Sequence, residues 1–168
     1  DLDGKTFTLK ETETLAGTTD TTATATSKQY PGFTFNENVE GTKTSGTITG
    51  DGKLVLKLYY TRNSYEVTYE YEGEVPTGAS ELPAKATYKY GENVTVAGAA
   101  TAPGYTFSGW DKKDFTMPAS NVVIKGSFKA NDDTQYKVEH YLEDLDGKTF
   151  TLKETETLAG TTDTTATA

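Results

Sequence analysis

One stretch of 25 residues, DLDGKTFTLKETETLAGTTDTTATA, occurs twice in this chain, as residues 1–25 and again as residues 144–168. Every position is identical, including those typical of solvent-facing sites, so chance or an old duplication is an inadequate explanation. Self-similarity at a fixed spacing is the signature of a repeat array. The spacing from Asp1 to Asp144 exceeds the period of solenoid repeats, which predicts one or two whole domains in each period. The chain is therefore expected to be a window on a longer tandem protein.

A weaker repeat lies inside this period. The matching segments are 31–35 with 103–107, 54–57 with 122–125, and 65–67 with 136–138, and both closing segments run on to an asparagine, Asn63 or Asn131. The pattern predicts two diverged modules of one ancestral fold, here called A and B, that alternate along the array. Residues 64–135 are predicted to be a complete module B. Residues 1–63 are predicted to be module A without its first strand, and residues 136–168 the first two strands of the next module A.

Alternation of apolar and polar residues predicts strands that each bury one face. The predicted strands are Tyr65–Glu72, Tyr136–Glu143 with His140 at a core-facing or half-buried position, Thr6–Leu15 with Phe7 and Leu9 inward, and the closing strands Leu54–Thr61 and Asn121–Ala130. Asp3-Gly4 and its repeat Asp146-Gly147 predict the tight turn that joins strands one and two. Gly50-Asp51-Gly52 indicates a further hairpin.

Only one stretch favours a helix, Thr21–Gln29, with Asp20 as its N-cap and Pro31-Gly32 as its stop. The expected fold class is therefore mostly β (α+β), built from small, mostly antiparallel modules with at most one short helix each. Modules of this size are near the lower limit for an independent core, so cooperation between neighbours is expected.

Two family resemblances follow from these motifs. Residues 65–130 resemble the internalin-type B-repeat (Listeria–Bacteroides repeat) family, through the sequence GYTFSGW at 104–110, FTMP at 115–118 and the strand that follows. Residues 1–63 and 136–168 resemble the mucin-binding-protein (MucBP) repeat family, through the 136–143 strand, Leu15-Ala16-Gly17 and Tyr30-Pro31-Gly32-Phe33. Both resemblances imply ubiquitin-like β-grasp modules in tandem arrays on cell-wall-attached surface proteins of Gram-positive bacteria.

Composition excludes several classes of function. The formal net charge of −9 leaves no basic patch for nucleic acid or for an anionic membrane. The absence of cysteine excludes disulfides, thiolate metal sites and cysteine nucleophiles. A single histidine without a serine elbow makes no recognisable catalytic triad, so no enzyme activity, catalytic residue or cofactor is expected.

Metal and cross-link chemistry is also not expected. Asp1-Leu2-Asp3-Gly4 resembles the start of a calcium loop but lacks the remaining acidic positions, and turn chemistry explains it. An isopeptide bond between Lys57 and Asn63 is disfavoured because the two residues lie on one strand, too far apart along it to meet.

Three aromatic residues are candidate glycan contacts: Tyr59, Tyr105 and Trp110. Trp110 is the sole tryptophan, and in so small a module it is favoured as the core anchor, packed with Phe107 and Phe115, over a ligand platform. The leading hypothesis is a structural stalk or fibre segment of a bacterial cell-surface adhesin that gives length and stiffness. The alternative is low-affinity, multivalent binding of mucin or host glycans, with avidity from copy number.

The expected partners are neighbouring repeats of the same chain, host glycan under the alternative hypothesis, and other copies through head-to-tail or lateral association. The repeat register motivates the head-to-tail expectation, because 1–63 begins without the strand predicted at 136–143. The closing strand at Leu54–Thr61 is expected to be the parallel neighbour of that first strand, so both A fragments are expected to be open sheets. Unpaired sheet edges favour strand addition.

Overall fold

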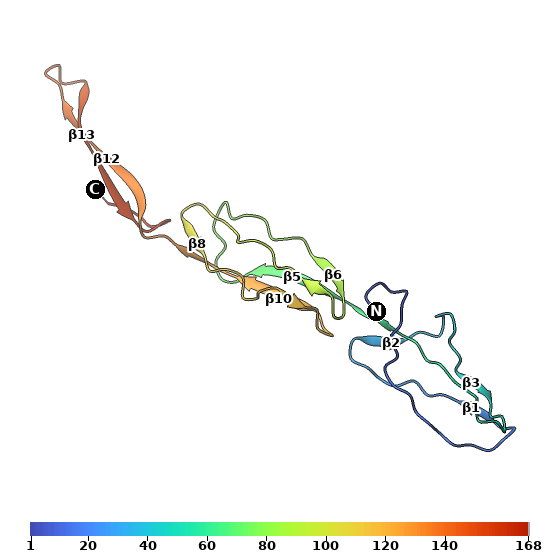
Figure 1. The fold of residues 1–168 in the computed structure, drawn as a ribbon. Helices are drawn as coiled ribbons and strands as arrows, with labels where there is room; N and C mark the ends of the chain where they lie inside the picture. The colour runs from blue at the N-terminus through green and yellow to red at the C-terminus, as the bar shows by residue number, and fades with distance from the viewer. Residues whose placement is uncertain (168) are drawn as a thin grey trace. The chain divides into compact units, whose positions relative to one another are not determined.

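A computed structural model describes residues 1–167, which form thirteen β-strands and no helix (Figure 1). None of these residues therefore belongs to a helix long and apolar enough to span a membrane. Ala168, the last residue of the second 25-residue repeat, lies outside the described residues. The predicted mostly-β class is confirmed, and the specific β-grasp assignment stays a prediction.

Spatial contacts divide the chain into two compact units that each draw on separate segments. The first unit contains Asp1–Thr68, Lys85–Val96 and Asp114–Val123, and the second contains the remaining described residues. This division follows spatial contacts and cuts across residues 64–135, so the module boundaries expected from the repeats stay a prediction.

The first unit contains short antiparallel pairs. Its strands are β1 (Thr22–Thr24), β2 (Phe33–Phe35), β3 (Ser45–Thr47), β4 (Tyr60–Arg62), β6 (Ala86–Lys89), β7 (Asn93–Val94) and β9 (Phe115–Thr116). β1 pairs with β3, β2 with β4, and β7 with β9. The predicted helix at Thr21–Gln29 is wrong, because β1 occupies its start. The Thr-Ala alternation there follows the two-residue period of a strand, and it leaves Ala23 half-buried between exposed threonines.

A three-stranded sheet has the order β10–β5–β6, with β5 (Ser64–Tyr71) between β6 and β10 (Val122–Gly126). β5 is antiparallel to β6, pairing Tyr65 with Tyr88. Glu66 N–H donates to Asn121 Oδ1 at 2.9 Å, and Glu72 N–H donates to the carbonyl of Gly126 at 2.8 Å. Both numbers rise together, so β5 and β10 run parallel. The alternating strand predicted at Tyr65–Glu72 is confirmed.

The second unit contains β8 (Tyr105–Phe107), β11 (Phe128–Ala130), β12 (Thr134–Glu143) and β13 (Phe150–Gly160). β8 pairs with β11, and β12 pairs with β13 along its whole length in an antiparallel hairpin. The strand predicted at Tyr136–Glu143 is therefore confirmed. The turn at Asp146-Gly147 is also confirmed, since Gly147 has φ +65 and the side chain of Asp146 accepts hydrogen bonds from the N–H groups of Lys148 and Thr149.

Identical sequence has two different structures in this chain. β13 is the second copy of the segment Phe7–Gly17, yet in the first copy that segment belongs to no strand. The prediction of a strand at Thr6–Leu15 is therefore wrong for the first copy, and Leu9 points outward there, 80% exposed. The reason is the partner: the second copy follows β12 directly and folds back onto it, whereas nothing in residues 1–167 pairs with the first copy.

The closing strands are shorter than predicted. In the segment Leu54–Thr61 only the end lies in a strand, β4, and Lys57 forms an isolated antiparallel bridge with Lys43. The corresponding Asn121–Ala130 forms β10 and β11. The hydrophobic core of the described residues lies between residues 64 and 135 and comprises Val67, Val94, Ala100, Ala102, Met117 and Ile124, and Pro76 in the same range is buried as well.

Candidate interaction sites

Three hydrogen bonds of 2.8 Å or shorter hold Asn63 directly before β5. Its N–H donates to the carbonyl of Gly32 at 2.8 Å, and its side-chain Oδ1 accepts from the Thr34 hydroxyl at 2.7 Å. Its own carbonyl accepts from the N–H of Tyr90 at 2.8 Å. Two bonds therefore reach back into residues 1–63 and one reaches forward into residues 64–135, which makes Asn63 a joint between the two predicted modules.

Asn131 makes the same three bonds at the next boundary. Its N–H donates to the carbonyl of Gly104 at 2.9 Å, its Oδ1 accepts from the Thr106 hydroxyl at 2.7 Å, and its carbonyl accepts from Thr162 N–H at 2.8 Å. We call these two arrangements the asparagine joints. The sequence predicts both asparagines only as strand ends, and their matching positions after the closing segments are the signal that marks them as equivalent.

Close packing accompanies the hydrogen bonds of the first joint. Gly32 is buried with φ +79, and a Cβ on it would collide with the ring of Tyr90. The Arg62 guanidinium lies 5.0 Å from the centroid of the Phe33 ring and donates from Nη1 to the Tyr90 carbonyl at 2.7 Å. In the second joint Gly104 lies against Thr162 in the same way. Glycine at these two positions lets the backbone of one module approach the next.

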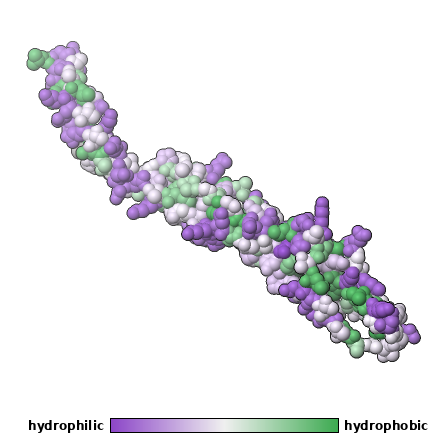
Figure 2. All heavy atoms as spheres, in the orientation of Figure 1, coloured by the Kyte–Doolittle hydropathy of each residue, from purple (hydrophilic) through white to green (hydrophobic). Residues whose placement is uncertain are grey.

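The 25-residue repeat shows what strand pairing does to its side chains. Leu9 and Leu15 are 80% and 85% exposed in the unpaired first copy, whereas the same residues in β13, Leu152 and Leu158, are 45% and 40% exposed. In Figure 2 apolar residues still interrupt the hydrophilic surface around this hairpin, located by its labels in Figure 1. Pairing with β12 therefore covers about half of the exposed leucine surface of this segment.

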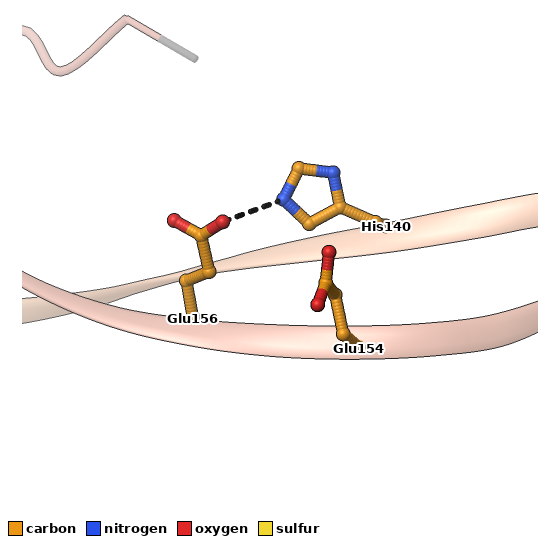
Figure 3. A group of neighbouring side chains, drawn as sticks. All are labelled: His140, Glu154 and Glu156. Carbon is orange, nitrogen blue, oxygen red and sulfur yellow. Dashed lines mark ion pairs between the residues drawn. The ribbon is translucent and has the colours of Figure 1, made fainter.

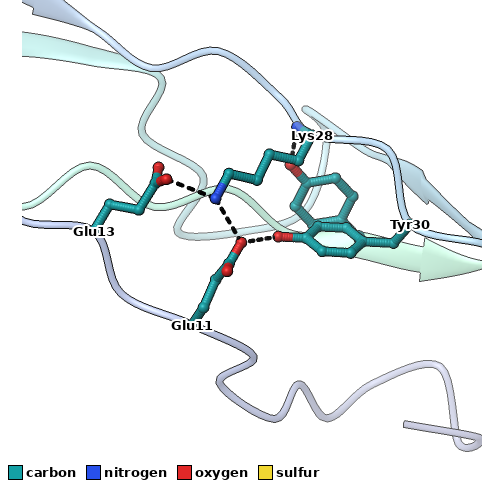
Figure 4. A network of polar contacts seen from close by, with 5 residues as sticks. Glu11, Glu13, Lys28 and Tyr30 are labelled. Carbon is teal, nitrogen blue, oxygen red and sulfur yellow. Dashed lines mark hydrogen bonds and ion pairs between the residues drawn. The ribbon is translucent and has the colours of Figure 1, made fainter.

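Two glutamates of the repeat also change partners between the copies. In the first copy Glu11 and Glu13 contact the Lys28 ammonium at 2.9 and 2.6 Å, and Glu11 accepts from the Tyr30 hydroxyl (Figure 4). The pKa of Glu11 is lowered, mainly by the hydrogen bond from Tyr30 and secondly by the one from Lys28. The pKa of Lys28 is raised, mainly by its hydrogen bond to Glu13 and secondly by the one to Glu11.

In the second copy the same two glutamates, Glu154 and Glu156, lie beside His140 of β12 (Figure 3). His140 Nε2 is 3.4 Å from Glu156. The core-facing or half-buried position expected for His140 is wrong, because the residue is exposed and its side chain is 46% accessible. The three groups are close enough to hold a cation, but all are exposed and no independent observation points to an ion. The expectation of no metal site therefore stays a prediction.

The Asp-Gly turns use their carboxylates internally. Asp3 accepts from the N–H groups of Lys5 and Thr6 and from the Thr6 hydroxyl. These bonds lower the pKa of Asp3 to about 2, and the backbone N–H groups of Thr6 and Lys5 have the largest effects. Asp146 makes the same set of bonds in the second copy, and the backbone N–H of Lys148 is the main cause of its lowered pKa. Turn formation thus accounts for the motif that resembles a calcium loop.

The three candidate glycan contacts are all half-buried and in contact with other residues. Tyr59 packs edge-on against Phe7 at 5.0 Å between ring centroids. The Tyr105 hydroxyl donates to Asp163 at 2.7 Å, which raises the pKa of Tyr105. Trp110 Nε1 donates to the carbonyl of Gly98 at 2.9 Å. Glycan binding by these residues stays a prediction.

Trp110 packs in an aromatic cluster of the second unit. Its ring stacks on Tyr71 at 5.8 Å and meets Tyr69 and Phe107 edge-on, each at 4.9 Å. The predicted contact with Phe107 is confirmed. Phe115, which was expected in the same cluster, instead belongs to β9, where it pairs with Val94.

Part of the chain is similar to known proteins. The family model of the divergent InlB B-repeat domain matches residues 65–132. Internalin H of Listeria monocytogenes is 30% identical over 149 residues, which cover 79% of this chain and 25% of that protein. The chain thus spans about a quarter of that relative. A solved structure of Streptococcal High Identity Repeats in Tandem (SHIRT) domains 3–4 from a cell surface protein aligns with a TM-score of 0.33 and 23% identity, over 70% of this chain and 81% of that chain.

Proposed function

We propose that this chain, whose residues 65–132 belong to the divergent InlB B-repeat family, is a stalk segment of a bacterial cell-surface adhesin. Its modules would give length and stiffness and hold a distal binding head away from the cell. We further propose cell-wall attachment, a Gram-positive source and no catalytic role. The similarity to Internalin H supports a surface repeat protein.

The asparagine joints are the observation that carries the proposal. A freely jointed array needs only a flexible linker between modules, of the Gly/Ser-rich kind. Here the boundary residue Asn63 is bonded to Gly32 and Thr34 on one side and to Tyr90 on the other. The bonds of Asn131 repeat this pattern. If every boundary between modules has a joint of the same fixed geometry, then the whole array is stiff.

Removing the Asn63 side chain is expected to loosen the first joint. Because the chain has no cysteine, spin labels can be placed on cysteines introduced at two exposed positions, Thr47 of β3 and Thr87 of β6. Double electron–electron resonance should give a narrow distance distribution for the parent chain. Asn63→Ala should broaden it, because the Thr34 hydroxyl loses its acceptor.

The matched control is Asn38→Ala, since Asn38 is exposed and outside the joint. It should leave the width unchanged. A distribution that is already broad in the parent chain, or one that Asn63→Ala does not alter, would contradict a stiff joint.

Weak glycan binding remains the alternative function. The arrangement of its three candidate residues gives it no specific support, because Tyr105 and Trp110 direct their polar groups to protein partners. A glycan array probed with the full chain separates the two functions: selective retention of mucin-type glycans would favour the alternative.

A further inference from the structure

Both asparagine joints dock a turn of the same backbone conformation. We call these turns, residues 89–92 after β6 and residues 161–164 after β13, the joint turns. In each, the fourth residue donates its N–H to the carbonyl of the first, at 2.9 Å in 89–92 and 3.3 Å in 161–164. The second residue donates its N–H to the asparagine carbonyl, and the third has positive φ, +81 at Gly91 and +58 at Asp163. The two joints therefore differ in side chains and not in the kind of turn.

The first joint is closed by a cation between two aromatic rings. The Arg62 guanidinium lies 5.0 Å from the ring centroid of Phe33 and 5.9 Å from that of Tyr90. Phe33 meets Tyr90 edge-on, with 5.5 Å between ring centroids. A Cβ at Gly91, the next turn residue, would lie 2.7 Å from Nη1 of Arg62. The arrangement thus uses an aromatic ring at the second turn position and space at the third.

The second joint is closed by a hydrogen bond to a carboxylate. The residues at the same four positions are Tyr105, Ala130, Thr162 and Asp163. The Tyr105 hydroxyl donates to Asp163 at 2.7 Å, across the joint from one predicted module to the next. Ala130 stands where the first joint has its arginine, and Thr162 stands where it has its second ring. A bond of this kind, to a charged acceptor, is stronger than one between neutral groups.

The two closures do not combine. In a module B end followed by a module B start, Ala130 would supply no donor to the Tyr90 carbonyl, and the Tyr105 hydroxyl would lose its carboxylate. In a module A end followed by a module A start, Phe33 would present no hydroxyl to Asp163, and the carboxylate side chain would take space that the arginine occupies. Polar groups that lose their partners at a half-buried contact destabilise it.

We propose that each asparagine joint selects the type of module that follows it. A module A end accepts a module B start, and a module B end accepts a module A start, so the alternating order of the array is set by the joints. The selecting residues are Phe33, Arg62, Tyr90 and Gly91 in the first joint and Tyr105, Ala130, Thr162 and Asp163 in the second. This selection rests on the proposed stalk function, because it acts only where the joints are formed.

A mismatch in the first joint tests the selection. In the full chain, Tyr90→Thr/Gly91→Asp gives this joint the turn residues of module A. Aspartate is compatible with the left-handed third position, as Asp163 shows. Amide exchange at residue 90, corrected for the intrinsic rate, should become roughly tenfold faster because the aromatic and cation–π contacts are lost.

Restoring the match is the decisive step. Adding Phe33→Tyr/Arg62→Ala to that variant gives the first joint all four residues of the second, and exchange at residue 90 should slow again by most of the lost factor. The control is Gly73→Asp, since Gly73 has φ +78 and no atom within 4 Å of its Cβ position. This control makes the same change of residue and charge outside both joints, and it should leave exchange in the joints unchanged.

A lighter substitution tests the second joint without removing a ring. Tyr105→Phe deletes only the hydroxyl that donates to Asp163. Exchange at the Thr162 N–H, which donates to the joint asparagine, should become roughly fivefold faster. Circular dichroism and the fluorescence of Trp110 verify that each variant remains folded.

Four outcomes would overturn the selection. They are a mismatched turn that leaves exchange at residue 90 unchanged, a restored match that exchanges as fast as the mismatch, a control that has the effect of the mismatch, and a Tyr105→Phe variant without effect at Thr162. These results are separate from the test of stiffness. A narrow distance distribution with a neutral mismatch would leave the stalk function standing and remove the selection, whereas a broad distribution in the parent chain would contradict the stalk function itself.

Discussion

Replacing Gly32 by alanine is expected to weaken the first asparagine joint by about 3 kcal/mol, the sum of backbone strain at positive φ and overpacking. Gly32 has φ +79, and a Cβ there would overlap the Tyr90 ring. The effect is local, so the measurement is amide exchange at the Asn63 and Tyr90 N–H groups, which both donate within the joint. Both should exchange roughly a hundredfold faster.

Gly52→Ala is the matched control for backbone strain. Gly52 has φ +66, but no atom lies within 4 Å of the Cβ position. Gly52→Ala should lower the stability of its own turn by about 1 kcal/mol, the cost of backbone strain alone, and should leave the joint unchanged. Equal effects of the two substitutions on joint exchange would mean that Tyr90 does not pack against Gly32 as described.

Replacing Gly126 by alanine is expected to destabilise the aromatic cluster by about 1–3 kcal/mol. Gly126 is buried at the end of β10, and an added Cβ would collide with the Phe107 ring and lie 3.0 Å from the Trp110 ring. Since Trp110 is the sole tryptophan, its fluorescence during denaturant unfolding reports on this region. The midpoint should shift to lower denaturant concentration.

Gly98→Ala provides the same substitution in open space. No atom lies within 4 Å of the Cβ position at Gly98, and its carbonyl, which accepts from Trp110, is retained. Its effect should fall within about 0.5 kcal/mol of zero. An equally small effect of Gly126→Ala would show that the cluster does not close over that glycine.

Local patterns were sufficient to predict the strands that alternate regularly. β5 and β12 follow directly from apolar residues at every second position. The A/B repeat also predicts that the strands next to β5 and β12 are equivalent in the two modules. In Thr21–Gln29 two signals conflict. The breaker at Pro31 and the cap at Asp20 favour a helix, whereas β-branched threonines alternating with alanine favour a strand. Asp20 has φ +64, and its N–H donates to the Ile48 carbonyl, so it does not cap a helix.

Features that depend on distant partners were not predictable from local sequence. Phe7–Gly17 and Phe150–Gly160 are identical, yet only the second is a strand, because only the second has β12 beside it. His140 lies on an exposed face because its hairpin has no further layer to cover it within the described residues. Asn63 and Asn131 were visible as matched positions, but their bonds depend on backbone groups about 30 residues away in the chain.

The stiffness of the first asparagine joint is tested most directly by ¹⁵N relaxation on both sides of Asn63. The comparison is between amides of β2 and β4, before Asn63, and amides of β6, after it. At a concentration where the protein sediments as one species, we expect a single rotational diffusion tensor to fit the relaxation rates of both sets of amides. Separate correlation times for the two sets, as for two bodies on a flexible linker, would contradict it.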